Sequence, residues 1–489
     1  MHIVAALDQA PEVRCVLGLF EGVVTGAADG YARMAGKPAC TLLHLGPGLA
    51  NGLANLHNAR RAHVPVINIV GQHATYHLRH DTPLASDIEA IARPYSNWLR
   101  TSSAVSEIGQ DAAEAIVAAR TAPGQIATLI IPADLAWNEG GALAGTPHTP
   151  KVPVPSAEIV ERAAVMLRSG KRTAILLTGS ALFGDGLAAA GLISASANAN
   201  VKLLAPYPFT RMERGTDVVA VERIAYVLEQ AVEQLKEFRQ MILVGASAPV
   251  SYFASPGRES LLTSPECEVH TLTEPGEDHI GALNALVASL SRRCTRPAEH
   301  KPERPLLPSG DIGLTGLAAT VGALLPENAI VVDESMTSGR GIMASTQGAP
   351  THDWLANTGG SIGIAMPLAV GASVACPDRQ VLCLSADGSG MYTAQALWTM
   401  ARENLRVTTV IFANREYAVL KREFSYLGIG EPGPRARDLF EIGRPDLDWV
   451  SLAKGMGVPG TRIRSLDGFA KALREGFESG GPALIEVRL

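Results

Sequence analysis

The sequence predicts an α/β protein made of three doubly wound, parallel-sheet domains. Apolar runs of strand length alternate with helical stretches along the whole chain, which is typical of parallel sheets with helices on both faces. Two segments rich in proline, glycine or charge interrupt this alternation and predict linkers. The chain has 489 residues, and a prior of roughly 150 residues per domain is consistent with three domains.

The first block covers residues 1–140 and contains the expected strands ACTLLHL, VPVINIV and ATLIIPA, with a helix over 48–62 between the first two. The segment NEGGALAGTPHTPKVPVPS follows as a linker. The second block covers 157–292, with the expected strands TAILLTG, VKLLAPY, QMILVGA and CEVHTL. After the charged, proline-rich segment RRCTRPAEHKPERPLLPSG, the third block covers 311–489 and contains AIVVDES, QVLCLSADGSG, VTTVIFANREY and ALIEVRL.

The composition favours a small-molecule substrate. With a net charge of -6 and a pI near 6.1, the chain lacks the basic surface that a nucleic acid or an anionic membrane would need as a partner. The first residues, MHIVAALDQAPEVR, have neither the basic start nor the long apolar core of a signal peptide, and no apolar run has the length of a membrane span, so we expect a cytoplasmic protein. The six cysteines form no CxxC pair, which argues against a zinc knuckle or a disulfide framework.

The strongest chemical pattern lies in the third block, where one expected strand runs out into Asp387 and the next into Asn414. A helix over 393–404 joins them, and such a crossover makes the strands parallel and places both side chains at the same carboxyl edge of the sheet. Carboxylate and carboxamide oxygens at this edge suit Mg²⁺ beside phosphate oxygens. Gly388 and Gly390 allow a phosphate to approach the backbone closely. An Asp-Gly turn and an Asn cap, both common after strands, are the alternative explanation.

A single carboxylate, Glu21, stands in VLGLFEGVVTGAADGYARMAG between an expected apolar strand and a helix rich in Ala, Val and Gly. A carboxylate in apolar surroundings is costly unless it is paired or protonated, so its presence suggests a function. The alternative is an acidic residue that the dipole of a helix N-terminus favours.

These segments resemble the thiamine diphosphate enzymes. ADGS, followed 27 residues after Asp387 by the Asn414 that closes an apolar strand, is similar to the signature of the family that contains acetolactate synthase large subunits, benzoylformate decarboxylase and pyruvate oxidase. The resemblance extends over nearly the whole chain. It implies a pyrimidine-binding domain over 1–140, a middle domain over 157–292 and a diphosphate- and Mg-binding domain over 311–489. The first domain is expected to be short at its N-terminus and to lack its initial strand.

The resemblance also assigns the cofactor ligands. It makes the side chains of Asp387 and Asn414 and the backbone carbonyl of Glu416 the ligands of Mg²⁺. Ala386 stands where the family usually has Gly, and Arg415 replaces the second Asn of the usual pair. The remaining residues that the resemblance places against thiamine diphosphate in this motif are Gly388, Ser389 and Tyr417.

Two further segments resemble cofactor contacts of the family. In NTGGSIGIAMPLAVG, Ile362 holds the position of the apolar residue that wedges between the two cofactor rings, a geometric contribution to catalysis. Gly360 would offer its carbonyl to the aminopyrimidine, and Thr337 lies where the family contacts phosphate. An ordinary core residue at a helix start is the alternative for Ile362.

In this family a glutamate like Glu21 hydrogen-bonds the pyrimidine nitrogen of the cofactor that the other subunit holds, which implies a homodimer or homotetramer with active sites at the subunit interface. His44 lies seven residues before Asn51, where acetolactate synthases usually carry a small hydroxyl residue and benzoylformate decarboxylase a catalytic histidine. Such a histidine relays protons near neutral pH. A histidine that caps a turn is the alternative. The second histidine of that decarboxylase has no match, because Met212 stands there.

The resemblance implies a thiamine diphosphate- and Mg²⁺-dependent cleavage of a 2-oxo acid, through an ylid and an enamine to an aldehyde, as in benzoylformate decarboxylase. Acetolactate synthase-like carboligation is the first alternative. A cofactor-binding homologue with impaired catalysis, owing to the missing N-terminal strand, is the second. FAD, which the middle domain of some relatives carries, is not expected, because LLTGSALFGDG and LVGASAP contain no G-x-G-x-x-G.

Overall fold

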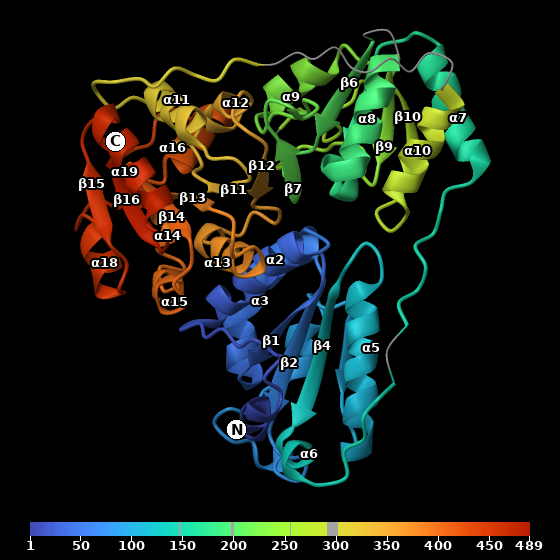
Figure 1. The fold of residues 1–489 in the computed structure, drawn as a ribbon, viewed down its shortest axis with the longest axis vertical. Helices are drawn as coiled ribbons and strands as arrows, with labels where there is room; N and C mark the ends of the chain where they lie inside the picture. The colour runs from blue at the N-terminus through green and yellow to red at the C-terminus, as the bar shows by residue number, and fades with distance from the viewer. Residues whose placement is uncertain (146–147, 197–199, 255, 291–301) are drawn as a thin grey trace.

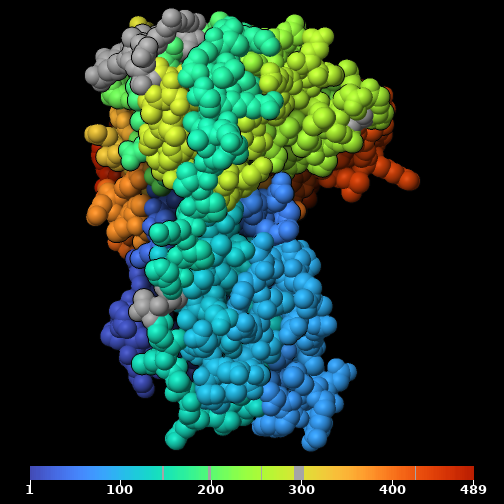
Figure 2. All heavy atoms as spheres, turned by 90° about the vertical axis from the view of Figure 1, so that its right-hand side faces the viewer, coloured from blue at the N-terminus to red at the C-terminus, as the bar shows by residue number. Residues whose placement is uncertain are grey.

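The computed structural model describes residues 1–145, 148–196, 200–254, 256–290 and 302–489. Their strands form a four-stranded, a five-stranded and a seven-stranded sheet. Figure 1 shows the first sheet in a lower lobe and the other two sheets side by side above it, and Figure 2 shows the same two lobes from another side. The predicted class, an α/β protein with three sheets dominated by parallel strands, is confirmed.

The first sheet has the strand order β1-β2-β4-β3, and every pair is parallel. Its strands are β1 (Ala39–Leu43), β2 (Val66–Gln72), β3 (Trp98–Thr101) and β4 (Ile126–Pro132). The helices of this lobe are α1 (His2–Ala6), α2 (Glu21–Ala35), α3 (Leu45–Arg61), α4 (Ile88–Ala92), α5 (Ile108–Arg120) and α6 (Ala133–Trp137). All seven residues of β4 are buried, because neighbouring strands and helices surround a central parallel strand.

Two expectations for the first block need correction. The apolar run over 16–20, before Glu21, is not a strand, since a strand needs a neighbouring strand to bond its backbone and none pairs with this segment. The helix expected from Gly48 begins at Leu45, because Pro47 in a first helical turn sacrifices no hydrogen bond. Residues 1–38, all of which are described, form helices, turns and coil without a strand.

The second sheet has the order β10-β9-β5-β6-β8, again with parallel pairs only. Its strands are β5 (Thr173–Leu177), β6 (Val201–Ala205), β8 (Glu222–Arg223), β9 (Gln240–Val244) and β10 (Glu268–Thr273). The helices around it are α7 (Ala157–Arg168), α8 (Gly184–Ser196), α9 (Leu228–Leu235) and α10 (His279–Leu290).

The third sheet has the order β15-β16-β14-β13-β11-β12-β7. Its parallel strands are β11 (Ile330–Glu334), β12 (His352–Ala356), β13 (Val381–Ala386), β14 (Val407–Ala413), β15 (Gly460–Ile463) and β16 (Ala483–Arg488). The helices of this part are α11 (Leu314–Leu324), α12 (Ile342–Ser345), α13 (Ala365–Ala375), α14 (Asp387–Gly390), α15 (Ala396–Arg402), α16 (Ala418–Tyr426), α17 (Pro434–Phe440), α18 (Trp449–Gly455) and α19 (Leu466–Glu478).

Strand β7 (Arg211–Arg214) comes from the segment between β6 and β8 but pairs antiparallel with β12 of the third sheet. Its sequence, RMER, has no apolar run and predicts no strand. An ion pair between Arg211 Nε and Asp353 Oδ1 at 2.6 Å joins the two strands. The second and third sheets are therefore tied together by backbone pairing as well as by side-chain packing.

The lower lobe is anchored to the third sheet where helix α2 packs on helix α13 (Figure 1). A Cβ added to Gly30 would come 2.1 Å from Leu368 O, and one added to Gly371 would come 1.9 Å from Ala27 O. Only glycine fits such a close approach of two helix backbones. No helix in the described part of the chain is long and apolar enough to cross a membrane.

Candidate active site

The carboxyl edge of the third sheet gathers most of the predicted site residues. Strands β11, β13 and β14 are parallel neighbours, with Glu334 opposite Ser385 and Ala386 opposite Phe412. The segments that follow these strands therefore leave the sheet side by side. The predicted site residues on them are Thr337, Ala386, Asp387, Gly388, Ser389, Asn414, Glu416 and Tyr417.

Asp387 is the first residue of α14 and is 1% exposed. Its Oδ2 accepts a hydrogen bond from Arg415 N at 2.7 Å, and its Oδ1 accepts one from Gly388 N at 2.8 Å. Burial raises the pKa of Asp387, while the Arg415 and Gly388 amides lower it. No cationic side chain in the described part of the chain forms an ion pair with this carboxylate, so a buried acceptor is left for a bound cation.

Asn414 follows β14 directly, and its Oδ1 accepts a hydrogen bond from Glu416 N at 3.2 Å. The side chain of Glu416 turns to Lys421, with Oε2 3.5 Å from Nζ. Among the described residues no group of three or more His, Cys, Asp or Glu side chains could hold a metal ion. A Mg²⁺ site needs no such group, because one carboxylate, one carboxamide and one backbone carbonyl already supply the oxygen ligands that this ion prefers beside phosphate oxygens. The predicted ligands Asp387, Asn414 and Glu416 are of these kinds.

The two glycines of ADGSG lie against aromatic rings. A Cβ on Gly388 would come 2.6 Å from Tyr417 Cε1, and one on Gly390 would come 2.9 Å from Trp449 Cη2. Both positions are therefore restricted to glycine by packing, whatever group approaches the backbone from the other side. Tyr417 thus has a packing role in this turn, in addition to the cofactor contact that the resemblance implies.

Strained backbone marks the same places. Three non-glycine residues next to predicted site residues have left-handed backbone, with φ of 54° at Leu45, 52° at Met336 and 58° at Arg415. Each costs roughly 1–3 kcal/mol and persists only where the surrounding structure over-determines it. They adjoin His44, Thr337 and Asn414. Strain of this kind is concentrated at ligand sites, which makes it an independent pointer to these three turns.

Gly360 and Ile362 lie between β12 and α13, in residues 357–364, which we name the cofactor loop. Gly360 has a φ of 77°, and Gly363, directly after Ile362, has a φ of 90°. Gly363 O accepts a hydrogen bond from Thr393 Oγ1 at 2.7 Å. Ile362 is partly exposed, whereas Gly363 and the first residues of α13 are buried, so Ile362 stands where the loop leaves the core.

Glu334 is a residue of this edge that the sequence analysis missed. It is the last residue of β11 and is 2% exposed. Burial raises its pKa to about 7, while amide donors from Ala365 and Gly363 act in the opposite direction. The pattern that could have revealed it is the DES segment, in which Asp333 and Glu334 close an otherwise apolar strand.

The predicted catalytic residues of the first lobe form a separate group. Glu21 opens α2, and its Oε2 accepts a hydrogen bond from Asn51 Nδ2 at 3.1 Å. A Cβ on Gly48 would come 3.1 Å from Glu21 Oε1 and 3.3 Å from His44 Cβ, so all four residues adjoin. His44 and Asn51 are exposed. Because Glu21 starts a helix, the helix-dipole explanation of this carboxylate also holds.

Within the described chain no hydrogen bond or ion pair joins Glu21 or His44 to the carboxyl edge of the third sheet. Met212 does not complement them, because it is fully buried in β7 opposite Trp354. The predicted site residues are therefore brought together in two groups, one on each lobe.

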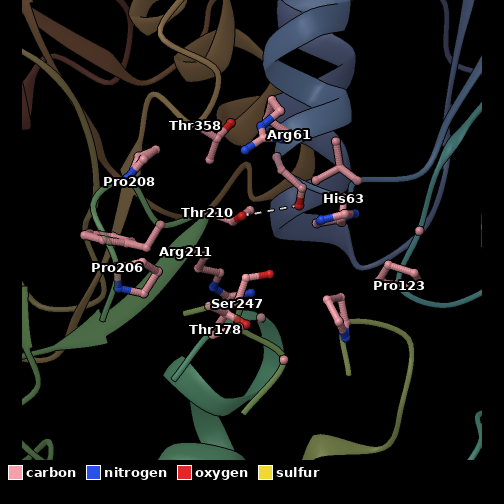
Figure 3. Close-up of a pocket in the computed structure, with 18 of the residues that line it drawn as sticks. Arg61, His63, Pro123, Thr178, Pro206, Pro208, Thr210, Arg211, Ser247 and Thr358 are labelled. Atoms are coloured by element: carbon pink, nitrogen blue, oxygen red, sulfur yellow. Dashed lines mark hydrogen bonds between the residues drawn. The ribbon is translucent and has the colours of Figure 1, made fainter. Parts of the chain in front are cut away.

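A cavity of about 810 Å³ lies at the carboxyl edge of the second sheet, and Thr358 of the cofactor loop is among the residues that line it (Figure 3). Figure 3 shows Thr178 and Ser247, from loops after β5 and β9, on one side and Arg61 and His63 of the lower lobe on the other. A hydrogen bond from Thr210 Oγ1 to Ala62 O at 3.3 Å bridges the two sides. None of the predicted site residues lines this cavity.

The Asp387 and Asn414 turn, the glycine-bounded loop and the Glu21 group together define a thiamine pyrophosphate enzyme. Residues 340–487 match the thiamine pyrophosphate enzyme C-terminal TPP binding domain, and residues 1–91 match the N-terminal TPP binding domain. The chain belongs to the thiamine pyrophosphate enzyme family, and its predicted membership is confirmed.

Among its relatives is a Mycobacterium tuberculosis protein provisionally named acetolactate synthase large subunit IlvX, 51% identical over 100% of this chain and 93% of the relative. Benzoylformate decarboxylase of Pseudomonas aeruginosa is 27% identical over 98% of this chain and 92% of its own. The solved thiamine diphosphate-dependent 4-hydroxybenzoylformate decarboxylase of Rhodococcus jostii has a TM-score of 0.82 at 24% identity, covering 97% and 91% of the two chains. That likeness shows a shared fold.

Proposed function

We propose that this protein is a thiamine diphosphate- and Mg²⁺-dependent enzyme that decarboxylates a 2-oxo acid to an aldehyde. The observation that carries the proposal is the buried Asp387, which forms no ion pair with a cationic side chain of the described chain and lies beside Asn414 at a shared strand edge. His44, exposed beside Glu21 and Asn51, supports decarboxylation over other reactions of the family.

The chain's residues divide the work. Asp387, Asn414 and the Glu416 carbonyl would hold Mg²⁺, and Thr337 and the 386–389 turn would receive the diphosphate. Gly360 and Ile362 set the pose of the two rings. When bound, thiamine diphosphate supplies a carbon nucleophile and an electron sink, which the loss of CO₂ from a 2-oxo acid requires.

Glu21 and His44 move protons in this proposal. Glu21 would share a proton with the pyrimidine nitrogen of bound thiamine diphosphate, and the hydrogen bond from Asn51 Nδ2 would orient its carboxylate. His44 gives a proton to the substrate carbon after CO₂ leaves, since imidazole exchanges protons near neutral pH. Both residues belong to a different lobe from Asp387, so we propose that they serve the cofactor of a second subunit in a homodimer or homotetramer.

Acetolactate synthase-like carboligation is the second candidate, because the relative that is 51% identical carries that name provisionally. The two candidates differ in their product: decarboxylation gives an aldehyde, whereas carboligation joins two 2-oxo acid molecules with loss of CO₂.

Incubation with benzoylformate or pyruvate, each with Mg²⁺ and thiamine diphosphate, separates the candidates. We expect benzaldehyde from benzoylformate, no product without the cofactor, and slower aldehyde release by His44→Ala. Acetolactate from pyruvate without benzaldehyde would replace decarboxylation by carboligation. Mg²⁺-dependent cofactor binding without turnover of any 2-oxo acid would leave a binding protein and contradict both candidates.

A further inference from the structure

The carboxylate of Glu334 holds the cofactor loop from the side of the third sheet. Gly363 N lies 3.0 Å from Glu334 Oε1 and 3.2 Å from Oε2, and Ala365 N donates to Oε2 at 3.1 Å. Asn357 Nδ2 donates to Oε1 at 3.2 Å. All these donors are N–H groups, and no cationic side chain of the described chain pairs with this carboxylate. The buried carboxyl group of Glu334 is thus hydrogen-bonded by amides of the loop and of the first turn of α13.

Asn357 extends the hydrogen bonding from Glu334 to Gly360. While its Nδ2 donates to Glu334, its Oδ1 accepts a hydrogen bond from Gly360 N at 2.8 Å. Its Nδ2 also lies 3.0 Å from Ser361 O. One carboxamide therefore connects the strand-end carboxylate to the residue that is proposed to face the aminopyrimidine.

Helix α3 of the lower lobe holds the loop from the other side. Asn58 Oδ1 accepts a hydrogen bond from Ser361 N at 3.1 Å, and Asn58 Nδ2 donates to Ser361 O at 2.8 Å. Thr358 Oγ1 donates to Asn58 O at 2.8 Å. A Cβ on Gly359 would come 2.6 Å from Asn58 Oδ1, so any side chain at this position would collide with Asn58. The carboxamide of Asn58 thus offers an acceptor to the N–H and a donor to the C=O of one residue, Ser361.

The loop itself has little intrinsic preference for one conformation. Gly360 and Gly363 flank Ile362, and both have left-handed backbone, with φ of 77° and 90°. Glycine gains the most conformational freedom when a restraint is removed, so an unheld loop of this composition would populate several conformations. The contacts from the two sides select one of them.

We propose that Glu334 and Asn58 are positioning residues that hold the cofactor loop from two lobes of the same chain and so fix Gly360 and Ile362 for the bound cofactor. The proposal rests on the proposed function, because it takes thiamine diphosphate as the ligand of this loop. Neither residue touches the reacting atoms; each acts through the backbone of residues 357–364.

The restraint is tested in the cofactor-free protein by hydrogen–deuterium exchange. We expect Glu334→Gln to speed exchange at Gly363 and Ala365 by about tenfold or more, and Asn58→Ala to do the same at Ser361, because each amide loses its acceptor or the fixed geometry around it. The matched controls are Glu486→Gln and Asn68→Ala, a buried glutamate and a buried asparagine that contact other parts of the chain. In these two control variants the amides of the cofactor loop should exchange at the wild-type rate. Unchanged loop exchange in both test variants, or equal acceleration in the controls, would overturn the proposal.

Calorimetric titration with thiamine diphosphate and Mg²⁺ supplies the second readout. We expect about tenfold weaker binding by Glu334→Gln and by Asn58→Ala, and affinities within about twofold of the wild type for the two controls. Faster loop exchange with wild-type affinity would refute the positioning role and leave the proposed function intact. A wild-type protein that binds no thiamine diphosphate would refute the proposed function, and the exchange data would then count only for the restraint. If Glu334→Gln fails to fold, Asn58→Ala carries both measurements.

Discussion

The two groups of site residues differ in how completely one chain builds them. At the third-sheet edge, Asp387 and Glu334 are 1% and 2% exposed, and backbone amides of the same chain bind both carboxylates. In the lower lobe His44 and Asn51 are exposed, and the Glu21 carboxylate has a single hydrogen-bond partner among the described residues, Asn51. Under the proposed function, the cofactor-holding group would be preorganised within one chain, whereas the proton-transferring group would present its side chains to a second subunit.

The largest effect should come from Glu21→Gln, which removes the carboxylate of Glu21 in the lower lobe and preserves the shape of the side chain. We expect kcat to fall by about 10²–10⁴-fold, the usual contribution of a positioned acid or base, with little change in cofactor affinity. Steady-state kinetics and calorimetric titration measure the two quantities. Glu12→Gln, an exposed position of the same lobe, is the control. Full turnover by Glu21→Gln would remove this residue from the proposed chemistry.

Asp387→Asn tests the group of site residues at the third-sheet edge and should weaken the binding of thiamine diphosphate with Mg²⁺. The substitution keeps the shape of the side chain but removes the charge that a hard divalent cation prefers, so we expect the affinity for thiamine diphosphate with Mg²⁺ to fall by more than about 100-fold. Calorimetric titration measures it, with Asp438→Asn on the exposed face of α17 as the control. If the two variants bind equally well, the metal site does not lie at this strand edge.

The pH dependence of stability should show the ionisation of Glu334. Its pKa is raised from 4.5 to about 7, chiefly by burial. Folded protein therefore keeps a proton that unfolded protein releases between these values, and the stability that Glu334 contributes is lost as pH rises through this window. Relative to Glu334→Gln, the wild type should lose roughly 3 kcal/mol of unfolding free energy across it, at about 1.4 kcal/mol for each pKa unit.

Thermal unfolding of the two proteins from about pH 5 to about pH 8 measures this difference as diverging Tm values. The titratable neighbours coupled to Glu334 from other elements are Cys383 and Tyr207, and burial raises the pKa of each above its ordinary value, beyond this window. Parallel Tm profiles for the wild type and Glu334→Gln would show that Glu334 does not titrate in the folded protein between these pH values.

Mixing Glu21→Gln with Asp387→Asn tests whether two subunits share one working site. If Glu21 of one subunit serves the cofactor held at Asp387 of another, subunit exchange between Glu21→Gln and Asp387→Asn creates sites with both wild-type residues. Random pairing gives about a quarter of all sites intact, so about a quarter of the wild-type activity should return. No recovery after verified subunit exchange would place both groups of a working site in one chain.

Long apolar strands were predictable because a strand that is buried on both faces is a continuous run of mostly apolar residues in the sequence. IATLIIP and VTTVIFA form β4 and β14, each buried at every position, and ADGS and the Asn414 turn follow strands as expected. RMER was not recognised as β7, because a short polar strand depends on its partner β12 and not on its own composition. The strand expected before Glu21 failed for the converse reason, since its apolar residues have no strand beside them.

The sequence by itself determined the α/β class and predicted the residue types of the candidate site, because strand periodicity and the residues around Asp387 and Asn414 are local properties of the chain. Only the tertiary structure decided which groups meet. It separated Glu21 from Asp387 and placed Asn58 of α3 against Ser361, more than 300 positions away. It also buried Glu334 among loop amides. Hydrogen-bond partners and desolvation depend on distances between residues remote in the chain, and no short stretch of sequence contains them.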